Sequence, residues 1–137
     1  MPRYAARRVL PATVEEVWAV LEQAERFADW WPGIDRVEPT VRRALAPGAL
    51  WNVEGPNRMT LRRRPQLSGT LLVLEVVPPR RLAFQLSGDR IDVELELEPA
   101  DDEQAQAILA VDAPRFTGVG RAFPSEALAK LAALVCP

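Results

Sequence analysis

Few side chains in this sequence could carry out acid–base, nucleophilic or metal chemistry. The chain has 137 residues, no histidine and a single cysteine, Cys136, beside the C-terminus. Without histidine, Ser-His-Asp and Cys-His catalysis, histidine metal sites and the usual proton shuttle near neutral pH are all excluded. One cysteine cannot form an intramolecular disulfide. We therefore expect neither a metal nor another cofactor.

A general acid or base would have to come from the remaining polar residues. The candidates for such a role are Tyr4, Asn52, Glu54, Asp112 and Arg115. The pattern of the surrounding sequence does not place any of them on an inner face, so we assign no catalytic residue.

Aromatic side chains are concentrated in the segment FADWWPGI, residues 27–34. The consecutive Trp30 and Trp31 cannot both point into one core from a regular helix or strand, and Pro32-Gly33 ends the segment in a turn. These rings therefore line a core edge, the mouth of a cavity or a partner surface. For Trp31 we favour structural packing, whereas Phe27 and Trp30 fit a ligand site and a core equally well.

Arginines cluster at Arg58, at 62–64 and at 80–81. Such a cluster could hold a carboxylate or phosphate at the entrance to a site. We favour a second interpretation, in which the arginines lie on a solvated sheet face and pair across strands with an acidic stripe. That stripe consists of Asp92, Glu94, Glu96 and Glu98.

The bulk composition narrows the class of protein further. A chain of this length predicts one domain, residues 1–137. The net charge of −2 argues against nucleic acid as the partner, because phosphate binding requires a basic surplus. No apolar run is long enough to span a membrane, and the N-terminal segment lacks the apolar centre of a signal peptide. We expect a cytoplasmic protein, without membrane insertion, that is a monomer or a homodimer.

Helical signals appear near both ends of the chain. A strand over residues 3–10 precedes a helix whose capping box pairs Thr13 with Glu16. A shorter helical turn follows at about residues 25–31. A terminal helix begins at Pro124 and turns one apolar face inward.

From residue 34 onward the hydrophobic period changes to two. The clearest strand is IDVELELE, residues 91–98, in which apolar and acidic side chains alternate. An irregular strand over 34–45 and strands near 50–54, 67–77, 82–86 and 105–111 share this period. The order strand, two short helices, about six antiparallel strands and a helix predicts an α+β fold. The terminal helix should cover the apolar face of the sheet.

Three local strings carry a resemblance to a known superfamily. They are PATVEEVWAVLEQAERFADWWPGI (11–34), APGALWNVEG (46–55) and VLEVVPPRRLAFQLSGD (73–89). With them, the chain resembles the START-like, pollen-allergen-like helix-grip superfamily (SRPBCC), and in particular its bacterial polyketide cyclase/dehydrase-type members. The resemblance implies a helix-grip fold, in which about seven antiparallel strands (β-α-α-β6-α) curve around the C-terminal helix. Here that helix is short for the superfamily.

The function that this resemblance implies is binding of a small hydrophobic ligand, of lipid, polyketide or aromatic type, between the sheet and the terminal helix. Two alternatives stay open: a cyclase or dehydratase without histidine or metal, and a protein-interaction domain that exposes Trp30 and Trp31. We favour ligand binding over catalysis. The expected ligand-binding residues are Phe27, Trp30, Trp51, Leu82, Phe84, Ile91, Val93, Leu95, Leu109, Val111, Phe116, Phe123, Leu128 and Leu131.

Overall fold

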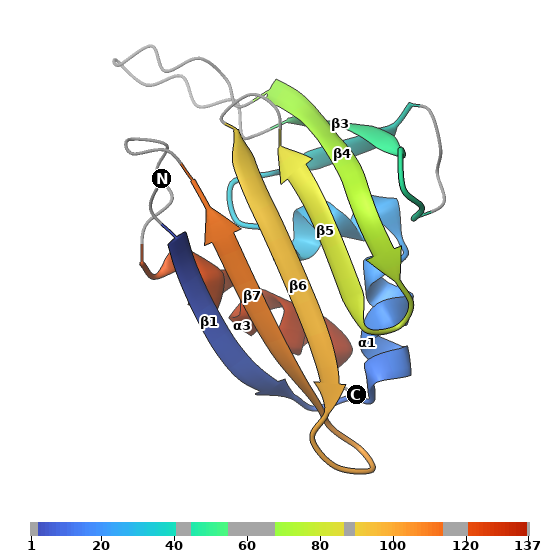
Figure 1. Ribbon diagram of the computed structural model, residues 1–137, viewed down its shortest axis with the longest axis vertical. Helices are drawn as coiled ribbons and strands as arrows, with labels where there is room; N and C mark the ends of the chain where they lie inside the picture. The colour runs from blue at the N-terminus through green and yellow to red at the C-terminus, as the bar shows by residue number, and fades with distance from the viewer. Residues whose placement is uncertain (1–2, 41–44, 55–67, 87–89, 114–120, 137) are drawn as a thin grey trace.

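A computed structural model shows an antiparallel sheet with helices on one side of it (Figure 1). It describes residues 3–40, 45–54, 68–86, 90–113 and 121–136. Within these ranges the sheet has seven strands in the order β1-β7-β6-β5-β4-β3-β2. The predicted α+β architecture and the predicted order of elements are confirmed.

The bounds of the elements follow the sequence pattern closely. The strands are β1 (Arg3–Leu10), β2 (Arg36–Pro39), β3 (Leu50–Glu54), β4 (Ser68–Val77), β5 (Arg81–Leu86), β6 (Ile91–Pro99) and β7 (Ala105–Asp112). The helices are α1 (Val14–Leu21), the 3₁₀ turn η1 (Ala24–Arg26), α2 (Phe27–Trp30) and α3 (Phe123–Val135).

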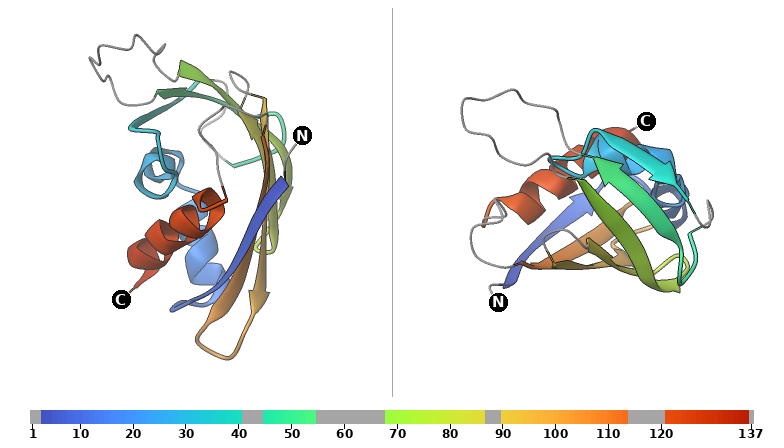
Figure 2. Two further views of the ribbon diagram at one scale, coloured as in Figure 1. Left: turned by 90° about the vertical axis from the view of Figure 1, so that its left-hand side faces the viewer. Right: turned by 90° about the horizontal axis from the view of Figure 1, so that it is seen from above.

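The sheet curves around the helices, which all lie on its concave side (Figure 2). α3 crosses this side and packs against β1, β7, α1 and α2. A bulge in β4 between Val73 and Glu75 shifts the pairing with β5 by one residue. Because a bulge bends the strand that contains it, this one adds to the curvature of the sheet.

Buried and partly exposed side chains alternate on the central strand β6, as the sequence predicts. Along β6 the apolar residues from Ile91 to Leu97 are buried, while the acidic residues between them are partly exposed. β7 repeats this alternation from Ala105 to Leu109, and the small Ala110 that follows is also buried. The concave face is therefore apolar, and the acidic side chains of β6 lie on the convex face.

Three segments differ from the expected elements or lie outside the described residues. Within the irregular strand expected over 34–45, the described residues form β2, which ends at Pro39, a residue that cannot donate a backbone hydrogen bond to a neighbouring strand. Residues 41–44 lie outside the described ranges, as do residues 55–67. Residues 114–120 are also outside them, and the terminal helix expected from Pro124 begins one residue earlier, at Phe123.

The predicted capping box opens α1. The amide of Glu16 donates to Thr13 Oγ1 at 3.2 Å, and the amide of Thr13 donates to Glu16 Oε1 at 3.3 Å. Two backbone donors that the first helical turn leaves without partners are thereby satisfied.

Replacing Thr13 by alanine is expected to lower the free energy of unfolding by about 1 kcal/mol, because one of these donors loses its acceptor. Thr13→Ser keeps the hydroxyl oxygen and should behave like the wild type. Urea denaturation of the three proteins measures the difference. Equal midpoints for the alanine and serine variants would show that the cap contributes nothing.

Candidate ligand site between the sheet and the terminal helix

The concave face of the sheet is apolar from one edge almost to the other. In the described strands β2 to β7, every concave-facing position holds an apolar residue, glycine or proline. Only the edge strand β1 departs from this, since Tyr4 and Arg8 share the phase of the buried Leu10.

One row of directly opposed side chains crosses this face. Tyr4 on β1 faces Val111 on β7, Val111 faces Val93 on β6, and Val93 faces Phe84 on β5. We call these four residues the Tyr4–Phe84 row. Its two middle members are valines with exposures of 0% and 1%, so aromatic rings stand at its ends and small side chains lie between them.

Phe84 belongs to a cluster of aromatic rings at the junction of α2, β5 and the start of α3. Its ring centroid lies 5.4 Å from that of Phe27 and 5.6 Å from that of Trp31, edge to face in both cases. Phe27 and Trp31 stack at 5.5 Å with their planes 17° apart. Trp30 meets both Phe27 and Trp31 edge to face, at 5.3 and 5.6 Å. These offset and edge-to-face geometries are the ones that aromatic pairs prefer.

The backbone at the end of α2 explains how two consecutive tryptophans enter one core. Trp30 is the last residue of α2, whereas Trp31 is already extended, with φ −89° and ψ 116°. This break in the helix turns both side chains inward, and each ring is 2% exposed. The hypothesis that exposed Trp30 and Trp31 form a protein-interaction surface is therefore wrong.

The structure buries nearly all of the residues expected to contact a ligand. The exposures of Phe27, Trp30, Trp51, Leu82, Phe84, Ile91, Val93, Leu95, Leu109, Val111, Leu128 and Leu131 lie between 0% and 6%. Phe123 is half-buried at the start of α3, with its ring 5.1 Å from that of Trp31. Phe116 lies outside the described residues. Contact of these side chains with a ligand stays a prediction.

Such low exposures have a physical consequence for access. Side chains that line an open, water-filled cleft would keep a substantial part of their surface exposed. The described lining is instead closed to water in this conformation, so a ligand can reach it only if α3, α2 or individual rings move.

The polar residues considered for catalysis are mostly far from this interior. Asn52 and Glu54 are exposed on the convex phase of β3, and Asp112 lies on the convex phase of β7. Tyr4 is half-buried on the concave phase, and Arg115 is outside the described ranges. No polar or charged side chain is buried in the part of the chain that the structure describes.

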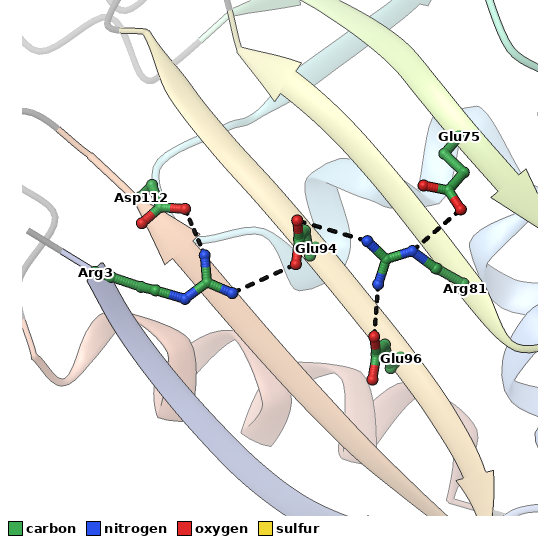
Figure 3. A network of polar contacts seen from close by, with 6 residues as sticks. All are labelled: Arg3, Glu75, Arg81, Glu94, Glu96 and Asp112. Carbon is green, nitrogen blue, oxygen red and sulfur yellow. Dashed lines mark hydrogen bonds and ion pairs between the residues drawn. The ribbon is translucent and has the colours of Figure 1, made fainter. Parts of the chain in front are cut away.

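The convex face carries a network of ion pairs, as predicted from the acidic stripe in the sequence (Figure 3). Arg81 contacts Glu75 at 3.2 Å, Glu94 at 3.5 Å and Glu96 at 2.5 Å. The predicted pairing of the 80–81 arginines with the stripe is thus confirmed for Arg81. The hydrogen bond to Glu75 and the charges of the three carboxylates raise the pKa of Arg81.

Glu94 joins this group to the edge strand. Its second carboxylate oxygen contacts Arg3 at 3.4 Å, and Arg3 also pairs with Asp112 at 2.6 Å. The negative charge of Asp112 is the main cause of the raised pKa of Arg3. Ala83 and Ala110 face Glu94 from the two neighbouring strands, and these small residues leave room for both guanidinium groups. The network therefore ties β1, β4, β5, β6 and β7 together on the side away from the apolar face.

Glu94→Gln is expected to destabilise the protein by up to about 1 kcal/mol, because partly exposed pairs contribute little individually and this residue serves two of them. The loss should shrink at high salt, since screening weakens both pairs in the wild type. Denaturation at low and high ionic strength measures it. Glu98→Gln on the same strand, with an exposed side chain, is the matched control. A salt-independent loss would contradict an electrostatic origin.

Comparison with known proteins agrees with this geometry. The sequence profile of the family described as "Polyketide cyclase / dehydrase and lipid transport" matches residues 1–135. This chain belongs to that family. No curated protein matches the sequence significantly.

Several solved structures share the fold at low sequence identity. A Chromobacterium violaceum protein superposes with a TM-score of 0.74 at 18% identity, covering 100% of this chain and 99% of its own. A conserved protein from Geobacillus kaustophilus gives 0.72 at 15%, covering 98% and 95%. Norcoclaurine synthase from Thalictrum flavum gives 0.72 at 10%, covering 98% and 92%. At these identities the likeness establishes the helix-grip fold alone.

Metal binding and membrane insertion can also be considered for the described residues. They contain no group of three or more Asp, Glu or Cys side chains placed to hold a metal ion. Nor does any described helix combine the length and apolar character that crossing a membrane requires.

Two features of the interior were not predicted from the sequence. Leu71 and Val73 of β4 face the concave side with 1% exposure each, but the bulge after Val73 interrupts their alternation. Tyr4 was named only as a polar candidate, although its spacing of six residues from Leu10, an even number along a strand, places both on one face. That spacing was the available signal.

Proposed function

We propose that this protein binds a small, largely apolar molecule between the concave face of the sheet and α3. The observation that carries the proposal is the composition of the concave face, which is apolar across the described strands β2 to β7. The aromatic cluster at one end of the Tyr4–Phe84 row supplies flat surfaces and ring edges for a ligand.

Membership of a family described by both cyclase/dehydrase activity and lipid transport supports binding of an apolar molecule in general terms. Binding without chemistry is the simpler function here, because apolar burial needs no titrating group inside the protein. Burial of about 250 Å² of ligand surface would contribute about 6 kcal/mol before the entropy lost on association is subtracted.

Entry of the ligand requires the interior to open. Phe123 at the start of α3 is half-buried, and its ring contacts that of Trp31 in the aromatic cluster. Trp31 directly follows α2, so this contact joins the two helices. Separation of these two rings would part the helices at this contact without breaking a strand pairing. We expect the ligand to enter here, and binding to be slower than diffusion because the opening precedes it.

A catalytic function receives less support. Among the described candidates only Tyr4 lies on the concave phase, and acid–base catalysis needs a proton donor or acceptor beside the substrate. We therefore place this protein with carriers and binding modules, acting as a monomer or a homodimer.

Native mass spectrometry of freshly purified protein, compared with the denatured sample, tests the proposal. A trapped ligand would add mass that is lost on denaturation, and the same spectrum reports the number of subunits. We expect one small organic molecule per chain, or one after incubation with an excess of biphenyl. Absence of any bound molecule in both samples would exclude the proposed function.

A further inference from the structure

Tyr4 interrupts an otherwise apolar surface at a defined place. It lies on the edge strand β1, directly opposite the fully buried Val111. Its side chain is half-buried, so it stands at the rim of the interior rather than in its centre. Arg8, the other polar residue on this phase, lies four positions further along β1 and is exposed.

The Tyr4–Phe84 row sets the geometry between this phenol and the aromatic cluster. Tyr4 and Phe84 are three strands apart in the sheet, which corresponds to about 14 Å at a spacing of about 4.8 Å between strands. Val111 and Val93 lie between them. An elongated molecule along the row would therefore contact aromatic rings at one end, aliphatic groups along its length and a phenol at the other end.

The hydroxyl of Tyr4 is available for such a contact. Among the residues that the structure describes, none forms a hydrogen bond with it. Tyrosine hydroxyls that are withdrawn from water usually have a partner, because a polar group without one is unfavourable there. A ligand in the interior would shield this hydroxyl from water and would have to supply that partner itself.

We propose that Tyr4 determines the specificity of the site and that its hydroxyl hydrogen-bonds a neutral oxygen group at one end of the ligand. This inference rests on the proposed binding function. The ligand class that it defines is an elongated apolar molecule with a hydroxyl or carbonyl group at its terminus. A neutral group is specified because burial of a carboxylate beside a phenol and aliphatic side chains would be strongly unfavourable.

Binding of biphenyl and para-phenylphenol to the wild type, Tyr4→Phe and Arg8→Met tests this inference by isothermal titration calorimetry. The two compounds differ by one hydroxyl, and Tyr4→Phe removes only the hydroxyl of the protein. We expect Tyr4→Phe to bind para-phenylphenol about three- to tenfold more weakly than the wild type and to bind biphenyl equally well. Arg8→Met should retain the preference of the wild type.

The possible outcomes separate this inference from the proposed function. If Tyr4→Phe and the wild type prefer para-phenylphenol to the same degree, the role of Tyr4 is overturned while apolar binding stands. Loss of the preference in Arg8→Met instead would assign the polar contact to Arg8 and also overturn it. If neither compound binds the wild type saturably, both the proposed function and the role of Tyr4 fail.

Discussion

Trp31→Ala is expected to lower the free energy of unfolding by about 3–5 kcal/mol, the usual range for removal of a large buried aromatic side chain. Trp31 is 2% exposed, and its ring meets those of Phe27, Trp30, Phe84 and Phe123. The substitution removes all four ring contacts and leaves a void at the junction of α2, β5 and α3. For a domain whose whole stability is about 5–15 kcal/mol, this loss is a large share.

Chemical denaturation followed by far-ultraviolet circular dichroism measures this effect. Trp31→Phe is the matched control, because it keeps an aromatic ring at the centre of the cluster and should lose clearly less stability. A loss below about 1 kcal/mol for Trp31→Ala would place this ring outside the core, since surface substitutions have effects of that size.

Leu128→Ala is expected to weaken the attachment of α3 and to destabilise the protein by about 2–5 kcal/mol. Leu128 is completely buried on the face of α3 that packs toward the sheet. Alanine is the stronger helix former, so the variant should not lose stability through the helix itself. The loss would therefore report the packing of α3 on the concave face.

The exposed Lys130, two residues further along α3, provides the control for this experiment. Lys130→Ala should change the stability by no more than about 0.5 kcal/mol. If both variants unfold at the same denaturant concentration, α3 does not close the interior as described, and the proposed site loses one of its walls.

The sequence was sufficient to predict the elements whose local pattern and tertiary environment agree. The alternation of IDVELELE reflects one buried face and one exposed face, and β6 adopts it over its whole length. The reciprocal hydrogen bonds of Thr13 and Glu16 are local, so their spacing predicts the start of α1 without knowledge of the fold. The sheet residues expected to contact a ligand followed from the same alternation, and their side chains are buried. Their contact with a ligand stays a prediction.

Features that depend on a single backbone deviation were beyond the sequence pattern. Burial of both Trp30 and Trp31 requires the extended conformation of Trp31, which no period of two or 3.6 residues anticipates. The bulge after Val73 likewise conceals the inward residues of β4. The network around Glu94 depends on which strands are neighbours, because Arg3 and Asp112 are 109 positions apart in the chain.

The arrangement divides the sheet into two faces with separate roles. Charged side chains on the convex face tie five strands together, as Figure 3 shows for the contacts of Arg3, Arg81 and Glu94. Apart from Tyr4 and Arg8 on β1, the concave face carries no charged or polar side chain in the described strands. This division suits the interior to the proposed apolar ligand, while the charged side chains of the convex face stay in contact with water.

The most direct test of apolar binding in the interior is a titration with biphenyl followed by NMR of the methyl groups. The methyl signals of Val93 and Val111 should shift and saturate at one molecule per chain. Val9, Leu74 and Val77, which are 48%, 49% and 47% exposed, serve as internal controls and should not shift. Shifts confined to these exposed residues, or growing without saturation, would place binding on the surface and contradict a ligand site between the sheet and α3.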